Sequence, residues 1–181
     1  PDDQEFTVAG TLAKWARAGS EITSVCITSG DSGSNEKTDP SITKQELVKI
    51  REEEQRNAAR VLGLKETVFL RYADGMLLPS IELRRDLARL VRKYKPDVVV
   101  CGDPTARFYG NSYMNHPDHR VAADVALDAI FPSAERIHHR HPLQRVSAGV
   151  EHQGVPVRGH HGIAVLGHAA AAKVGAGSLR R

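Results

Sequence analysis

Two short clusters of acidic and imidazole side chains could do chemistry in this chain. The first is Asp2-Asp3 and the second is His116-Pro117-Asp118-His119. His116 and His119 are three residues apart, so on a helix they share one face of its first turn. Carboxylate and imidazole ligands around an open position are typical of hydrolytic sites that use Zn²⁺ or Fe²⁺. Such a metal lowers the pKa of its bound water towards ~7, and a free carboxylate beside that water is a general base.

Each cluster alone also has a plainer structural explanation. Acidic residues near a helix start often only offset the helix dipole, and the histidine cluster could be a helix cap with solvated rings. The predicted elements separate these alternatives, because Asp2-Asp3 lies where a first strand would end and the histidine cluster lies beyond the strand over 97–101. Sites in open α/β sheets form at the carboxyl ends of strands, so the two clusters together favour a catalytic site.

The elements that would position these clusters alternate between helical and strand patterns, which is typical of a parallel α/β sheet. Apolar periodicity predicts helices over about 4–18, 43–62, 81–95 and 117–130, and strands over 22–28, 67–70 and 97–101. Thr43 and Glu46 match a capping box. Ser80 is expected to cap the third helix, and Pro117 suits the first position of the last one.

A strand is missing in front of the first predicted helix. The chain opens with Pro1 and enters that helix directly, although a parallel sheet requires a strand before it. The first strand of a doubly wound sheet is usually central. We expect its absence to expose two strand edges and to make the chain unstable or prone to aggregate. We therefore predict an α/β, Rossmann-like three-layer fold with a mostly parallel sheet that lacks its first strand.

The residue composition changes abruptly at residue 134. All nine aromatic residues lie before it, and seven of the nine histidines lie after it. Apart from an Ala-rich stretch at 169–172, residues 134–181 show little hydrophobic periodicity. They also have too few large apolar side chains to offset the conformational entropy that is lost when a chain becomes ordered. We predict a folded domain over 1–133 and a weakly ordered, basic, His-rich tail over 134–181. The tail is either a natural extension or an out-of-frame translation, and the sudden change in residue usage favours the second.

The distribution of charge excludes one class of partner. The chain has a net charge of +3, but residues 134–181 carry seven basic and two acidic side chains, so residues 1–133 are at −2. Because the net positive charge lies outside the predicted domain, we expect no nucleic-acid partner. No apolar run approaches the ~20 residues of a membrane span. Cys26 and Cys101 lie in apolar runs, as reduced core residues do, so we expect a cytoplasmic protein without a secretory leader.

Several motifs over residues 1–133 resemble, in order, those of the PIG-L/LmbE-like N-acetylglucosaminyl deacetylases. Pro1-Asp2-Asp3-Gln4-Glu5 looks like the end of the family's His-Pro-Asp-Asp-x-Glu motif, and His116-Pro117-Asp118-His119 looks like its second motif. Thr28-Ser29-Gly30-Asp31 and the helix from Arg51 to Gly63 also match. The resemblance implies a zinc-dependent hydrolase, with Fe²⁺ as the alternative metal. Its substrate would be a small-molecule N-acetylglucosamine-type conjugate, from which it removes the acetyl group; the sequence leaves the aglycone and the oligomeric state open.

The resemblance also implies a role for each residue of the two motifs. Asp2 would be the general base, and Asp3 and His119 would be zinc ligands. His116 would stabilise the oxyanion or protonate the leaving amine, and Asp118 would hold its ring. Arg51 would contact the substrate, although without the resemblance it is equally well explained as a solvated residue of a charge-rich helix.

This sequence departs from the family pattern at both ends. The family's first zinc ligand is a His directly before the position of Pro1, and the family's C-terminal region helps to wall the substrate cleft. With Asp3 and His119 as its only protein ligands, a metal would bind much more weakly. We therefore predict that the chain as it stands is inactive although its parent is an enzyme.

Two alternatives from other classes stay open. The chain could be an inactive remnant of such an enzyme, or a non-catalytic Rossmann-like module that binds a nucleotide or a sugar through the loop at 29–33. That loop lacks the Gly-x-Gly-x-x-Gly pattern, and Asp31 would repel phosphate. The later loop that carries Phe108, Tyr109 and Tyr113 could be an aromatic platform for a sugar or could pack into the core.

Overall fold

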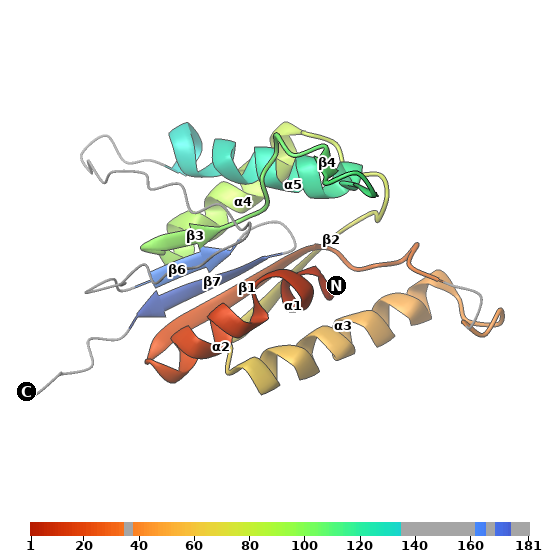
Figure 1. Ribbon diagram of the computed structural model, residues 1–181, viewed down its shortest axis with the longest axis horizontal. Helices are drawn as coiled ribbons and strands as arrows, with labels where there is room; N and C mark the ends of the chain where they lie inside the picture. The colour runs from red at the N-terminus through yellow and green to blue at the C-terminus, as the bar shows by residue number, and fades with distance from the viewer. Residues whose placement is uncertain (35–37, 135–161, 166–168, 175–181) are drawn as a thin grey trace, which may run out of the picture.

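A nine-residue strand, β1 (Ser20–Thr28), runs through the middle of the protein and organises the rest of the fold (Figure 1). The computed structural model describes residues 1–34, 38–134, 162–165 and 169–174. Every residue of β1 except Glu21 is buried, as expected of a strand that is covered on both faces. Its parallel neighbour is β2 (Glu66–Tyr72), so the predicted parallel α/β pairing is confirmed.

The main sheet has five strands in the order β2-β1-β6-β3-β7. The strand predicted over 97–101 is β3 (Val98–Val100). Both β6 (Gly162–Val165) and β7 (Ala169–Val174) pair with β1 and with β3, β6 in parallel and β7 antiparallel (Figure 1). Among the described residues, the first element is the helix α1 (Asp3–Thr7). The expectation of two unpaired edges is wrong, because later segments supply backbone partners to both.

The two added strands belong to the segment for which weak order was predicted. The Ala-rich stretch forms β7, which pairs with β1 from Ala169 opposite Val25 to Val174 opposite Ser20. The rest of the predicted tail, over 135–161, 166–168 and 175–181, lies outside the described residues.

Helices cover both faces of the sheet and give the predicted three layers (Figure 1). One face carries α1 (Asp3–Thr7), α2 (Ala9–Arg17) and α3 (Lys44–Leu62); the other carries α4 (Ile81–Tyr94), α5 (Pro117–Asp128) and a π-helical turn, η1 (Ala129–Ala134). Successive side chains of a strand point to opposite faces. Ile22 therefore packs with Leu12 of α2, whereas Val25 and Ile27 pack with Leu83 of α4.

The helix ends follow the predicted signals, with one difference. Thr43 and Glu46 form the capping box of α3, and Ser80 Oγ accepts a hydrogen bond from the Leu83 amide at 3.1 Å. A single helix was expected over 4–18, but Val8 leaves the helical region with a φ of −133° and separates α1 from α2. The break allows α1 to be held by its own buried contact, in which Ser24 Oγ donates to Gln4 Oε1 at 2.8 Å.

The two cysteines are free thiols, as predicted. Cys26 is buried and Cys101 is half-buried. Burial raises the pKa of the Cys26 thiol, and burial together with the charge of Asp103 raises that of Cys101 to about 11. Among the helices that the structure describes, none combines the length and the apolar character needed to cross a membrane.

Candidate functional site

The two predicted clusters meet at the carboxyl edge of the sheet. Asp3 begins α1, His119 lies in the first turn of α5, and His119 Nε2 is 3.3 Å from Asp3 Oδ1. The ring of His116 has its centroid 5.4 Å from that of His119. The neighbouring Pro1 packs against Gly30, two residues beyond the end of β1. The structure therefore brings together acidic and imidazole groups that are far apart in the sequence.

The pair formed by Asp3 and His119 offers one carboxylate oxygen and one imidazole nitrogen. Zn²⁺ and Fe²⁺ accept both kinds of donor. Within residues 1–34 and 38–134, no group of three or more His, Cys, Asp or Glu side chains is arranged to hold an ion. The pair fits two positions of a metal centre, and that part of the chain does not supply a third.

Asp2 is held beside the site by α3. It has a φ of 82°, and its amide donates to Gln55 Oε1 at 3.0 Å. Arg51 donates through Nη2 to Asp2 Oδ2 at 2.6 Å and to the carbonyl of Pro1 at 3.2 Å. Burial disfavours the charged guanidinium, but the hydrogen bond to Asp2 and the charge of Glu54 raise the pKa of Arg51 above its ordinary value. Arg51, which was predicted to contact the substrate, therefore binds Asp2, the predicted general base.

His116 forms the N-cap of α5, and its ring has a defined orientation. Its Nδ1 accepts a hydrogen bond from the amide of Asp118 at 3.2 Å. A neutral imidazole that accepts at Nδ1 carries its proton on Nε2. His116 therefore presents an N–H donor on the other side of its ring, which suits the stabilisation of a developing negative charge.

The carboxylate of Asp118 binds a loop, which differs from the contact with the His116 ring that the resemblance implies. Asp118 is 1% exposed, and its two oxygens accept hydrogen bonds from the amides of Gly75 at 2.7 Å and Leu77 at 3.2 Å. Asp31 holds the same loop, because its Oδ1 accepts from the amide of Asp74 at 2.9 Å. The 73–77 segment between β2 and α4 is therefore attached to the site through main-chain donors.

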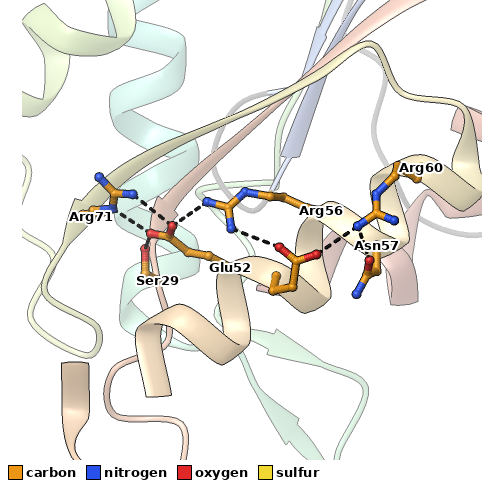
Figure 2. Close-up of polar contacts among 7 residues, drawn as sticks. Ser29, Glu52, Arg56, Asn57, Arg60 and Arg71 are labelled. Atoms are coloured by element: carbon orange, nitrogen blue, oxygen red, sulfur yellow. Dashed lines mark hydrogen bonds and ion pairs between the residues drawn. The ribbon is translucent and has the colours of Figure 1, made fainter. Parts of the chain in front are cut away.

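A buried carboxylate that sequence reasoning missed lies one residue after Arg51. Glu52 is 3% exposed and accepts hydrogen bonds from Ser29, Arg56 and Arg71 (Figure 2). The hydrogen bond from Arg71, opposed by burial, lowers the pKa of Glu52 below its ordinary value. The run of acidic residues in this helix indicated a solvated face, so nothing in the local pattern distinguished Glu52 from its neighbours. The available signal was Arg71, a charged residue that directly follows the apolar run at 68–70.

The loop with the aromatic residues forms a short hairpin of β4 (Phe108–Tyr109) and β5 (Tyr113–Met114). Phe108 is 67% exposed, Tyr109 47% and Tyr113 51%. The alternative in which these rings pack into the core is therefore wrong. The hairpin is joined to α5 through Asn115, whose amide donates to the carbonyl of Arg107 at 2.8 Å.

A mostly parallel α/β sheet with acidic and imidazole groups at its carboxyl edge is typical of a Rossmann-like protein, and the groups lie where such folds carry their sites. Residues 1–130 match the family described as PIG-L: GlcNAc-PI de-N-acetylase, and the chain belongs to this family. It is 31% identical over 130 residues to a diacetylchitobiose deacetylase of Thermococcus kodakarensis, covering 72% of this chain and 46% of that protein. It is 32% identical over 133 residues to a probable N-acetyl-alpha-D-glucosaminyl L-malate deacetylase 2 of Bacillus anthracis, covering 72% and 55%.

A solved structure shows the same fold. The N,N'-diacetylchitobiose deacetylase from Pyrococcus horikoshii matches with a TM-score of 0.65 and 38% identity, over 72% of this chain and 46% of that one. The match confirms the predicted Rossmann-like fold and the resemblance to the deacetylase family. The chain spans about half the length of the relatives that it matches.

Proposed function

We propose that this chain carries the catalytic edge of a metal-dependent N-deacetylase that acts on an N-acetylglucosamine-type conjugate. The observation that carries the proposal is the 3.3 Å approach of His119 to Asp3, with Asp2 and His116 beside them. Membership of the PIG-L family and the deacetylase names of its relatives support the substrate class. The proposal includes a cytoplasmic location, supported by the two unpaired thiols.

Asp3 and His119 would hold Zn²⁺ or Fe²⁺ in this proposal. When bound, the metal would supply Lewis-acid polarisation of the acetamide carbonyl and a water of lowered pKa. Asp2 would take the proton of the attacking water as its oxygen bonds to the carbonyl carbon. The N–H of His116 would stabilise the oxyanion or donate a proton to the leaving nitrogen. The carbon–nitrogen bond then breaks, and acetate and a free amine are released.

Arg51 would act on Asp2 before it acts on the sugar. Its guanidinium is 2.6 Å from Asp2 Oδ2, and it also pairs with Glu54. If a substrate hydroxyl displaced the contact of Arg51 with Asp2 or with Glu54, the guanidinium would keep the other contact. Arg51 would therefore orient the base in the free protein and contact the conjugate during binding.

The first test of the proposal measures metal affinity. Zinc is titrated calorimetrically into the chain and into a version with a histidine added before Pro1, which restores a third ligand. We expect the extended version to bind at least ~10-fold more tightly, because one further ligand is gained. Asp3→Ala and His119→Ala should abolish the gain, whereas Asp124→Ala, an exposed position of α5, should keep it. Equal affinity in the Asp3→Ala variant would exclude the metal site.

The second test measures chemistry. Acetate released from N,N'-diacetylchitobiose with zinc present is compared between the chain and the histidine-extended version. We expect release by the extended version only, and its loss in Asp2→Asn, which removes the base. Turnover by the unextended chain at a comparable rate would disprove the predicted inactivity, and full activity of Asp2→Asn would disprove the assigned base.

A further inference from the structure

Glu52 is a buried charge that the proposed chemistry does not use, and both of its oxygens are fully engaged. Oε1 accepts from Ser29 Oγ at 3.0 Å and from Arg71 Nε at 2.7 Å. Oε2 accepts from Arg71 Nη2 at 3.0 Å and from Arg56 Nη2 at 2.9 Å (Figure 2). The pair with Arg71 is bidentate, which fixes both the distance and the orientation of the two groups. Glu52 thereby connects α3 to the ends of β1 and β2.

Arg71 occupies a backbone conformation that requires support. Its φ is +59°, in the left-handed region that side chains with a Cβ rarely adopt. The register shows why: Cys26 pairs with Phe69 but Thr28 pairs with Tyr72, so between these two pairs β2 has one residue more than β1. An extra residue of this kind makes a β-bulge, which bends the strand and redirects the chain that follows. The residue at this bulge, Arg71, is the one that makes the bidentate pair with Glu52.

The bulge leads directly into the loop that binds the second catalytic motif. Two residues after Tyr72, Asp74 donates its amide to Asp31, and the next amides of the loop reach Asp118. Asp118 in turn orients the ring of His116 through its own amide. A displacement of the bulge would therefore change the position of the amides that hold the start of α5.

The same carboxylate is next to the groups that hold the first catalytic motif. Arg51 precedes Glu52 on α3 and donates to Asp2. Ser29 precedes Gly30, and a Cβ at Gly30 would lie 3.0 Å from Pro1 Cδ. Glu52 is therefore adjacent in sequence to Arg51, which binds Asp2. It also hydrogen-bonds to Ser29, the residue before Gly30, which packs against Pro1.

We infer that Glu52 is a positioning residue that fixes the two catalytic motifs relative to each other by holding the Arg71 bulge. The inference rests on the proposed function for naming these motifs catalytic. It assigns to the Glu52–Arg71 pair a conformational task in addition to its contribution to stability.

The test follows amide hydrogen exchange at Gly75 and Leu77 by NMR in the full chain, without metal or sugar. Neither residue hydrogen-bonds to Glu52, so their amides report on the position of the loop. In Glu52→Gln we expect both amides to exchange at least ~10-fold faster. The control is Glu53→Gln, the neighbouring helix position, which is more than half exposed and pairs only with Arg56 and Arg60 in the described structure. It should leave both rates unchanged.

Rescue distinguishes positioning from stabilisation. Glycine adopts a positive φ without support, so Arg71→Gly in the Glu52→Gln background should return both amides to slow exchange. A pair that only adds stability predicts that the double variant exchanges as fast as Glu52→Gln.

If Glu52→Gln does not fold, Arg71→Lys replaces it, because lysine keeps the charge but cannot form the bidentate pair. A folded Glu52→Gln or Arg71→Lys variant with wild-type exchange at both amides overturns the inference. A failure to release acetate in the separate assay bears only on the proposed function.

Discussion

Replacing Asp118 by asparagine tests whether its carboxylate holds the loop between β2 and α4. The substitution preserves shape but removes the charge and one of the two acceptor oxygens. One of the two loop amides, that of Gly75 or that of Leu77, then faces a side-chain NH₂ group at a position that is 1% exposed. Leu77 is buried, so its amide cannot find water in place of the lost acceptor, and the cost falls on the folded state when that bond is the one removed.

The size of the effect follows from the two contacts. A hydrogen bond to a charged acceptor contributes about 1.5–3 kcal/mol, and a buried donor left unsatisfied costs about 1–3 kcal/mol. The asparagine oxygen retains one neutral hydrogen bond, worth about 1 kcal/mol. We therefore expect Asp118→Asn to lower the free energy of unfolding by about 2–4 kcal/mol, toward the upper end of the range for single substitutions.

Urea denaturation followed by circular dichroism measures this difference. The matched control is Asp124→Asn, the same chemical change at an exposed position of the same helix, where we expect less than about 0.5 kcal/mol. Equal midpoints and slopes for the two variants would refute the reasoning, because they would show that the two loop hydrogen bonds contribute nothing. Loss of stability in both would instead indicate that α5 tolerates no asparagine.

Three further predictions concern the backbone, the buried acid and the thiols. Gly30 and Gly19 both have positive φ, but only at Gly30 would a Cβ lie 3.0 Å from the N-terminal proline, so thermal melts should show Gly30→Ala less stable than Gly19→Ala by ~1 kcal/mol. Folding lowers the pKa of Glu52 below its ordinary value of 4.5. The ionised carboxylate therefore contributes its full stability above pH 4.5, and this contribution is lost as the pH falls below 4.5 through the pKa of the folded state. The melting temperature of Glu52→Gln should therefore fall less steeply than that of the wild type below pH 4.5, and parallel curves would contradict this. Burial raises the pKa of the Cys26 thiol and, with the charge of Asp103, that of Cys101 to about 11. Variants that keep only one of the two cysteines should therefore react with a disulfide reagent at pH 8 at least ~10-fold more slowly when folded than in urea. Equal rates would show that the fold does not protect the thiols.

The sequence predicted the elements of the fold where local signals were strong. The capping residues Thr43, Glu46 and Ser80 have short-range geometry, so their spacing alone located the starts of α3 and α4. The pairing of β6 and β7 with β1 could not be predicted, because it depends on backbone edges that the rest of the fold creates. The hairpin of β4 and β5 was also missed, since each of its strands has only two residues and shows no period.

The candidate site was predictable in its residue types and only partly in its contacts. Strand order placed Asp3 and His119 at one edge of the sheet, and the structure has them 3.3 Å apart. The contact between Arg51 and Asp2 required knowledge of how α3 crosses the N-terminal segment. The role of Glu52 depends on a bulge in β2, and a one-residue register shift leaves no mark in hydrophobic periodicity.

The attachment of the 73–77 segment through its backbone has a consequence for protein engineering. Asp31 and Asp118 accept hydrogen bonds from peptide N–H groups, which every residue except proline provides. Met76 is 75% exposed, and Leu78, two residues further along, is 71% exposed. These two positions can therefore be randomised while the path of the chain is retained, which makes this turn a suitable place to install new recognition chemistry beside the candidate site.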